Sequence, residues 1–498
     1  MPILAKGEAI ESSSLDHRLD YWRVDDDGVV HVEEFAPEMI ATIPPDERSI
    51  DPVAVLSLLG FNYICLDRTL IQGVQRLPAF SRLRSDGTIE PLALPPYDDC
   101  FVPPRQLAKR FVELFFDELC TYCSGYDRVY VLLSGGMDSR ILVGALSRLK
   151  KQGRLDAEIT TVTFGSPGCR DVVYAREVAE ATGFDWRAVP LTSVHYRRNF
   201  ELAARLAAGE NLPYDIHRYD WFENVEPDSL VLMNIYGDGV GRRQYSSNHL
   251  TNIPSHRAGE PSALLNRNRI GQWRSQLQCD IDQLQARFFL PNETAGRELE
   301  MNIHYLRRMI VQACRLINRW ATVRQVFSSR ELVSYVWRHR IDHREDEFYE
   351  AILEITAPQL LDIPYAKTGA LYRAPARDDG YEKRTSDYPR WGRRQLRSTI
   401  FSELTSGALD SLEIFDMDQV YWMYREWQRE EEGADTFLGK QMVMLATLSR
   451  FVERYDVGPP RDEPPQPAGR AQWRALWERY VARSLQITRR VSRPIRVR

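Results

Sequence analysis

No apolar run in the sequence approaches the roughly 18–20 residues that a membrane-spanning helix needs, so no span is predicted. Basic residues are not in excess, because 65 Lys and Arg stand against 70 Asp and Glu, for a formal net charge of −5. This balance gives no general electrostatic case for nucleic-acid binding. One local exception is the arginine-rich segment 487–498, for which two readings stay open: a solvated tail, or contact with an anionic partner or surface.

Cysteine is sparse and shows no paired pattern. The seven cysteines are scattered and odd in number, which favours reduced thiols over a disulfide framework. Cys120 and Cys123 form one CxxC, but no second CxxC or CxxH follows, so no zinc site is predicted. The first 18 residues have only a short apolar start followed by acids and serines, unlike a secretory signal. Together these features predict a cytoplasmic protein.

Two common nucleotide motifs are also missing around the segment VYVLLSGGMDSRILVGAL (129–146). No lysine follows its glycines, so the Walker A pattern is absent, and GxGxxG is absent too. The segment nevertheless indicates a buried strand, a glycine turn and a helix. Gly135 and Gly136 allow close backbone approach, and the helix beginning near Asp138 adds its N-terminal dipole, so the turn favours an anion such as phosphate. Ser134 and Ser139 add hydroxyl donors.

Asp138 has the wrong charge for a phosphate site unless a cation lies beside it. A Mg²⁺ ion held by one carboxylate and by phosphate oxygens would resolve this conflict. The simpler alternative is an Asp or Ser that caps an ordinary helix after a tight turn. The order of strand, SGGxDS and helix favours the phosphate site.

The chain divides into regions of different composition. Residues 1–100 predict a small strand-rich domain, with a hairpin in YWRVDDDGVVHVEEF and a helix beginning at Pro52. In residues 105–245 strands alternate with helices, which predicts a parallel α/β sheet. Residues 250–460 are mostly helical by pattern, and 461–498 contain a linker, a final helix and the basic tail.

The predicted fold is therefore an α/β, doubly wound parallel sheet with a helical C-terminal extension and a small strand-rich N-terminal domain. In such sheets ligands bind outside the carboxyl ends of the strands. Three turns are expected to meet there: 134–139, 165–171 and 236–241.

Three stretches resemble one family. LLSGGMDSR (132–140) resembles the phosphate loop of the N-type ATP pyrophosphatases, or PP-loop enzymes, and its flanks are most similar to the synthetase domain of asparagine synthetases. TFGSPGCRDVVYAREVAEATG (163–183) is similar to a second family segment. YGDGVGRRQY (236–245) stands where the family has Ser-Gly-(Asp/Glu)-Gly-x-Asp-Glu, and 51–79 is a weaker match. Relatives of this family include β-lactam synthetases and lasso-peptide cyclases.

The resemblance implies a ligase that uses ATP to adenylate a carboxylate, releases pyrophosphate, and lets ammonia or an amine form the amide. ATP and Mg²⁺ are the implied cofactors. The residues implied to bind the pyrophosphate moiety are Ser134, Gly135, Gly136, Asp138 and Ser139, with Asp138 also on Mg²⁺. Around the rest of the nucleotide the resemblance implies Leu133 and Phe164 at the adenine, Tyr236 and Gly237 nearby, and Asp238 as an acid or base at the acyl-adenylate.

The N-terminus departs from the family. Complete asparagine synthetases begin with Met-Cys, whereas this sequence begins Met1-Pro2, and its first cysteine is Cys65. The region before the synthetase part is also about half the length of the family's glutaminase domain. We therefore expect a truncated, degenerate glutaminase-like domain without glutamine hydrolysis. The amine would come from free ammonia, a substrate amine or a separate amidotransferase.

The third stretch departs as well, because Gly241 and Arg242 replace the family's Asp-Glu pair, whose Asp helps to hold Mg²⁺. Three outcomes stay open: another carboxylate substitutes, Arg242 and Arg243 neutralise the pyrophosphate directly, or the ATP chemistry is weakened. The family's lysine near the pyrophosphate has no secure counterpart. Lys367 is the candidate, with plain surface as its alternative, and Arg344 is the fallback.

Two branches of the reaction stay open. One amidates a small carboxylate, as in asparagine biosynthesis, and the other closes an internal amide in natural-product or peptide biosynthesis, with a precursor peptide as partner. Asp238 favours the first branch or the peptide cyclases, because β-lactam synthetases have Tyr at this position. The rivals from other classes are a degenerate synthetase that acts as a binding or scaffold protein and a tRNA-modifying PP-loop enzyme. The acidic balance argues against the latter.

Overall fold

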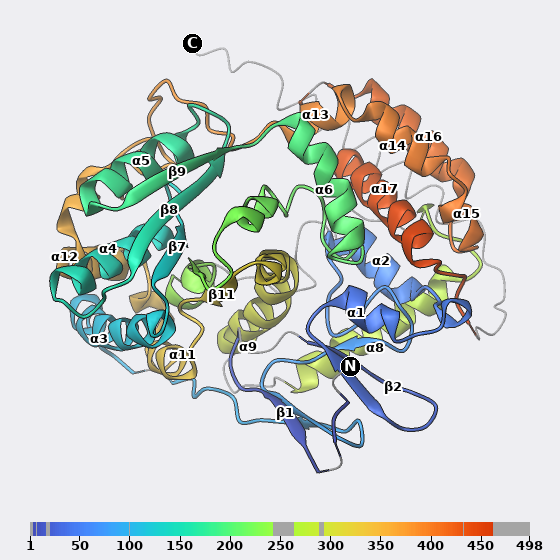
Figure 1. The fold of residues 1–498 in the computed structure, drawn as a ribbon, viewed down its shortest axis with the longest axis horizontal. Coiled ribbons are helices and arrows are strands. Elements are labelled where there is room, and N and C mark those ends of the chain that lie inside the picture. The colour runs from blue at the N-terminus through green and yellow to red at the C-terminus, as the bar shows by residue number, and fades with distance from the viewer. Residues whose placement is uncertain are drawn as a thin grey trace.

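The computed structural model describes the chain except for residues 1, 2, 6, 16–19, 99, 243–262, 288–292, 432 and 462–498. Its largest sheet has five strands in the order β11-β10-β7-β8-β9, with every neighbouring pair parallel, and lies in the left half of the view in Figure 1. Its strands are β7 (Arg128–Leu132), β8 (Glu158–Gly165), β9 (Asp185–Pro190), β10 (Leu230–Met233) and β11 (Thr322–Gln325). The predicted parallel α/β sheet is confirmed.

The central strands are apolar on both faces because helices and turns cover both sides. In β10, Leu230 and Leu232 face one core cluster, while Val231 and Met233 face the other. Four helices lie together on one side of the sheet in Figure 1: α3 (Pro104–Cys123), α4 (Met137–Lys151), α5 (Arg170–Thr182) and α12 (Asp346–Thr356). Helix α6 (Ser193–Arg205) lies on the other side and packs against α17 (Phe437–Tyr455).

The strand order places a switch point at β7. From β7 the chain runs outward through β8 and β9, and then returns to add β10 and β11 on the opposite side of β7. Ligands of open parallel sheets bind outside the carboxyl ends of the strands at such a point. The turn 134–139 follows β7 directly, so the fold presents it at the expected ligand edge.

The N-terminal region is strand-rich, as predicted. Its two small sheets contain β1 (Ala9–Ser12), β5 (Ser81–Arg84) and β6 (Ile89–Pro91) in one, and β2 (Tyr21–Val24), β3 (Val30–Glu33) and β4 (Gln75–Arg76) in the other. The expected hairpin is β2–β3, in which Tyr21 pairs with Glu33. Two helices follow, α1 (Ala36–Ala41) and α2 (Pro52–Phe61), and Asp51 caps α2 by accepting the N–H groups of Val53 and Ala54.

The region predicted to be mostly helical also supplies strand β11, which the sequence pattern did not reveal. Leu230 of β10 pairs with Thr322 of β11, so this region completes the central sheet. Besides α12, α17 and short 3-10 helices, its described helices are α8 (Ile270–Arg287), α9 (Glu293–Glu300), a π-helix (Met301–Val311), α10 (Gln312–Cys314), α11 (Arg330–Trp337), α13 (Tyr388–Arg394), α14 (Arg397–Leu404), α15 (Ala408–Ser411) and α16 (Met417–Arg429). The predicted final helix and the basic tail lie outside the described residues.

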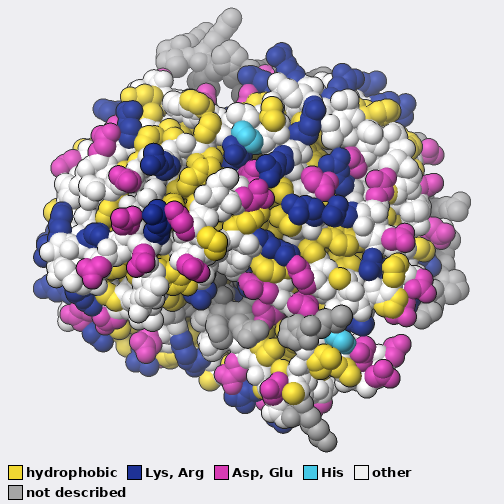
Figure 2. Space-filling model, viewed as in Figure 1, with side chains coloured by type: hydrophobic (Ala, Val, Ile, Leu, Met, Phe, Trp, Pro, Cys, Tyr) yellow, Lys and Arg dark blue, Asp and Glu magenta, His cyan; other side chains and the backbone are white. Residues whose placement is uncertain are grey.

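The surface is of mixed charge. On the face in Figure 2, Lys and Arg side chains alternate with Asp and Glu side chains across the surface. Among the described helices, none combines the length and apolarity that a membrane crossing requires.

Candidate functional site

Two serines close the turn between β7 and α4. The Ser134 N–H donates to Ser139 Oγ at 3.2 Å, and Ser139 Oγ donates to the Ser134 carbonyl oxygen at 3.0 Å. The Gly136 N–H donates to Ser134 Oγ at 3.1 Å. Gly136 is also the N-cap residue of α4, and no side-chain hydrogen bond caps this helix. The start of α4 therefore keeps the partial positive charge that attracts an anion.

A buried arginine, Arg140, holds the same turn through hydrogen bonds from the interior of the protein. Arg140 has no exposed surface, and its guanidinium donates to Gly135 O at 3.1 Å. It also donates to the carbonyl oxygens of Leu360 (3.1 Å), Ile363 (2.6 Å) and Pro364. A planar guanidinium can hold several acceptors at once, so this one side chain sets the distance between the turn and residues 360–364.

Residues 364–385, called here the covering segment, lie against the turn. The Ala366 N–H donates to Gly135 O at 3.1 Å. Asp171, at the start of α5, bridges the two parts, because its Oδ1 accepts the Gly135 N–H at 3.0 Å and its Oδ2 accepts the Thr385 hydroxyl at 2.9 Å. The turn, the start of α5 and the covering segment thus form one hydrogen-bonded unit.

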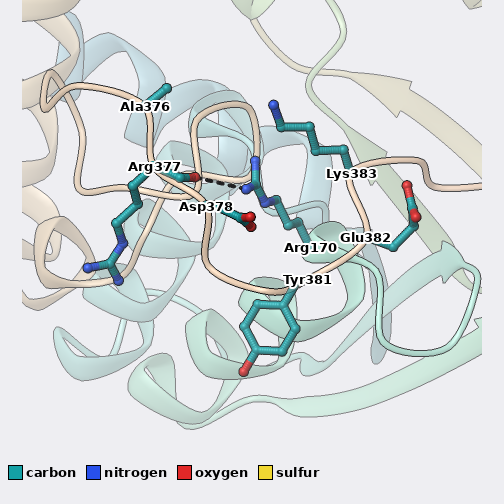
Figure 3. Close-up of a pocket in the computed structure, with 7 residues that line it drawn as sticks. All are labelled: Arg170, Ala376, Arg377, Asp378, Tyr381, Glu382 and Lys383. Carbon is teal, nitrogen blue, oxygen red and sulfur yellow. Dashed lines mark hydrogen bonds between the residues drawn. The ribbon is translucent and has the colours of Figure 1, made fainter. Parts of the chain in front are cut away.

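The covering segment lines an open polar pocket of about 490 Å³ beside the start of α5 (Figure 3). Arg170 forms its buried wall, donates to the Arg377 carbonyl oxygen at 3.0 Å, and pairs with Asp379 at 2.8 Å. Figure 3 shows the Arg377 side chain turned away from Arg170. The other lining residues are Ala376, Asp378, Tyr381, Glu382 and Lys383. Arg170 therefore serves mainly to fold the covering segment.

Residues 236–241, called here the third loop, pass directly beside the turn 134–139. They contain one π-helical turn, Gly237–Gly241. A Cβ on Gly237 would overlap the Asp138 carboxylate, so only glycine allows this approach. Asn234 Nδ2 donates to the Asp138 carbonyl oxygen at 2.6 Å. The Arg242 N–H closes the π turn on Gly237 O at 3.2 Å, which returns Arg242 to the side of Asp238.

Arg242 is the cation at the centre of the site. Its guanidinium forms an ion pair with Asp238, lies 3.6 Å from Asp138 Oδ2, and lies 3.8 Å from Asp346 Oδ1. It also packs over the Tyr349 ring at 4.9 Å from the centroid. The Arg242 side chain is 13% exposed, and Asp138 and Asp238 are 20% and 28% exposed, so each of the three is partly accessible to solvent.

The surroundings raise the pKa of Asp138 to about 7. Burial is the main cause, because it penalises the charged carboxylate, and the neighbouring Asp238 adds repulsion. The Arg242 charge opposes both effects.

The carboxylates present do not fit a resident Mg²⁺ ion. Within the described part of the chain, no three His, Cys, Asp or Glu side chains form a group that could hold a metal. The two acids nearest the turn, Asp138 and Asp238, already share the Arg242 guanidinium. Mg²⁺ at Asp138 thus stays a prediction that this arrangement does not support.

The remaining predicted residues differ in their surroundings. Leu133 is buried, and its carbonyl oxygen accepts the Thr163 hydroxyl at 2.7 Å. Phe164, at the end of β8, is half-buried and stacks on His217 with ring centroids 6.5 Å apart. Tyr236 is fully buried, and its hydroxyl donates to Leu15 O at 3.0 Å, which ties the third loop to the N-terminal region.

The two residues predicted to supply a cation for the pyrophosphate, Lys367 and Arg344, lie in different places. Lys367 is exposed and directly follows Ala366, so it lies beside the turn. Arg344 has no exposed surface, is paired with Glu298 at 2.6 Å, and donates to Val240 O at 2.9 Å. Arg344 supports the third loop from its buried side, and its contacts are with Glu298, Val240 and Tyr97 rather than with residues of the turn. Arg243 lies outside the described residues.

Sequence reasoning missed Arg140, Asp171 and Tyr349. Arg140 is the last residue of the segment 132–140, and a charged residue next to the apolar run of α4 could have indicated a buried role for it. Asp171 was noted as the acid of the second stretch, but no partner could be assigned. Tyr349 carried no local signal, because it lies in an acidic helix far from the three loops.

Comparison with known proteins agrees with this geometry. Residues 124–215 match the family model described as asparagine synthase. No curated protein matches the chain. The matched segment contains the turn 134–139 and Asp171, and it supports an ATP-dependent amide-forming synthetase family in general. Residues 124–215 of the chain are therefore similar to asparagine synthases.

Proposed function

We propose that this protein is an ATP-dependent ligase that activates a carboxylate as an acyl-adenylate and then forms an amide. The observation that carries the proposal is the turn 134–139 at the switch point of the sheet, next to the start of α4 and held by Arg140 and Asp171. An anion site of this kind suits the polyphosphate of ATP. The asparagine synthase match supports the same reaction class.

The chain's residues take the following roles in the proposal. The N–H groups at the start of α4 and the hydroxyls of Ser134 and Ser139 bind the β- and γ-phosphates, and Lys367 approaches them from the covering segment. Phe164 borders the adenine. A substrate carboxylate oxygen attacks the α-phosphorus, the bond to the β-phosphate oxygen breaks, and pyrophosphate leaves. Adenylation turns a poor electrophile into one with a good leaving group.

Amide formation completes the proposed reaction. The amine nitrogen attacks the acyl carbon, AMP leaves, and Asp238 accepts the proton that the amine loses. The amine is free ammonia, an amine of the substrate itself, or ammonia from a separate amidotransferase. The carboxylate belongs to a small molecule or to a peptide.

A second candidate function is a non-catalytic synthetase homologue that binds a partner. The observation that favours it is the pairing of Arg242 with both acids of the site, where the family pattern has carboxylates. Against it stands the intact turn, because a scaffold needs neither Ser134 nor Ser139 in hydrogen-bonding positions.

The test is pyrophosphate–ATP exchange, together with mass spectrometry of adenylated products, on the purified chain with ATP, Mg²⁺ and a panel of carboxylates. The proposal expects exchange that depends on one carboxylate and is lost in Ser139→Ala. Glu113→Gln, an exposed change on α3, is the matched control and should leave exchange unchanged. Nucleotide binding without any adenylate across the panel would favour the non-catalytic candidate. Absence of all adenine-nucleotide binding would overturn the ligase proposal.

A further inference from the structure

Gly241 and Arg242, which replace the Asp-Glu pair of the family pattern at the end of the third loop, both contact Tyr349 or the space it fills. A Cβ on Gly241 would lie 2.5 Å from Tyr349 Oη and 2.9 Å from Cε2 of the same ring. Tyr349 is fully buried, so it cannot move aside without opening the core. The ring therefore occupies the space of any side chain at position 241, and Arg242 packs over that same ring.

Four elements converge on the Arg242 guanidinium. Asp138 comes from the turn, Asp238 from the third loop, and Asp346 from α12. The covering segment adds Tyr372, whose hydroxyl accepts from Arg242 Nη1 at 3.4 Å. A side chain held by four elements is well positioned, and Asp138 is its link to the phosphate-binding turn.

The charge of the site supports a direct role for this arginine. The family pattern has carboxylates at four positions, those of Asp138, Asp238, Gly241 and Arg242, for a formal charge of −4. In this chain the same positions carry two carboxylates and one guanidinium, for a formal charge of −1. Four carboxylates repel a polyphosphate unless cations are bound, whereas these positions, at −1 or at −2 with the nearby Asp346 included, repel it less.

We propose that Arg242 is the protein's own cation for the β- and γ-phosphates of the nucleotide, in place of a metal ion held by carboxylates. On polyphosphate binding the guanidinium exchanges part of its pairing with Asp138 and Asp238 for phosphate oxygens, to which its planar fork is well suited. This inference rests on the proposed function, because it presumes an adenine nucleotide at the turn.

Two binding measurements test the proposal without any turnover. The first is isothermal titration with the α,β-methylene analogue of ATP, in EDTA and in Mg²⁺. The wild type should bind in EDTA within about threefold of its affinity in Mg²⁺. Arg242→Gln should lose about tenfold or more of the affinity in EDTA, the size expected for one charge-assisted contact, and Arg242→Lys should recover part of that loss. Arg373→Gln, an exposed change near Tyr372, is the control and should bind as the wild type does.

The second measurement is Mn²⁺ binding to the nucleotide-free protein by electron paramagnetic resonance. The wild type should show no stoichiometric site at the turn, and Arg242→Glu should create one, because it adds a carboxylate to Asp138, Asp238 and Asp346. Circular dichroism confirms that each variant is folded. Stoichiometric Mn²⁺ binding by the wild type that Asp138→Asn abolishes would overturn the inference.

The two proposals fail in different ways. Analogue binding by the wild type only when Mg²⁺ is present, or an Arg242→Gln variant that binds normally in EDTA, would overturn the inference and leave the ligase proposal standing. No binding of the analogue in either condition would overturn the proposed function, and the inference with it.

Discussion

The buried carboxyl of Glu118 should make the free energy of unfolding fall as the pH rises. Glu118 lies on α3, is 7% exposed, and accepts the Ser329 N–H at 3.2 Å, where Ser329 caps α11 just after β11. Burial raises the pKa of Glu118 from its ordinary value of 4.5 to about 7. The unfolded chain therefore releases this proton near pH 4.5, whereas the folded chain keeps it until about pH 7.

The sign and the size follow from proton linkage. Between these two values the folded state binds more protons than the unfolded state, so stability is fully present below pH 4.5 and is lost as the pH rises through 7. One pKa unit corresponds to about 1.4 kcal/mol, so the ionised carboxyl should cost about 3 kcal/mol above pH 7.

Glu118→Gln tests this reasoning, because the amide keeps the shape and the acceptor oxygen but cannot ionise. Urea unfolding from pH 5 to pH 8 should show a variant whose advantage over the wild type grows with pH, to about 3 kcal/mol at pH 8. Glu113→Gln, exposed on the same helix, should show a difference that does not change with pH. A constant gap between Glu118→Gln and the wild type across this range would refute the argument.

Two further substitutions probe the turn itself. In Gly237→Ala the new methyl would overlap the Asp138 carboxylate, so we expect a loss of about 1–3 kcal/mol in stability from overpacking, measured by urea unfolding. An unchanged unfolding midpoint would show that Gly237 is not in tight steric contact with Asp138. In Arg140→Lys the ammonium cannot reach all of the carbonyl oxygens that the guanidinium binds, and each buried acceptor left unpaired costs about 1–3 kcal/mol. Thermal unfolding should shift to clearly lower temperature, and a shift no larger than that of Arg105→Lys, an exposed change, would contradict this account.

Much of the α/β part could be predicted because its signals are local. Strands β7 and β10 are short apolar runs, β8 is rich in β-branched residues, and α4 and α5 have helical periodicity close to glycine turns, so neighbouring residues carried the information. Strand β11 escaped because its four residues, TVRQ, lie among helices and become a strand only by pairing with β10, about 90 residues earlier. No local pattern encodes that pairing.

The site could be predicted only as far as its motifs reach. The serines and glycines of the turn were evident, and the four-residue spacing of Asp238 and Arg242 could have indicated their ion pair. The role of Arg140 could not, because its partners are backbone oxygens, and every residue has one. Arg344 was misleading for the opposite reason: a lone arginine in an acidic stretch gave no sign of its buried partner, Glu298.

The contacts of Arg140 also bear on the order in which the protein becomes functional during its synthesis. Arg140 and Pro364 are 224 residues apart in the sequence, and Asp171 and its partner Thr385 are 214 residues apart. At about 5–20 residues per second, a ribosome needs roughly 10 to 45 seconds to make the intervening chain. Throughout that interval the nascent chain already contains the turn but lacks the carbonyl groups that hold it. On the proposed function, a growing chain should therefore bind nucleotide only after the covering segment has left the ribosome, even though the motif itself emerges in the first third of the protein.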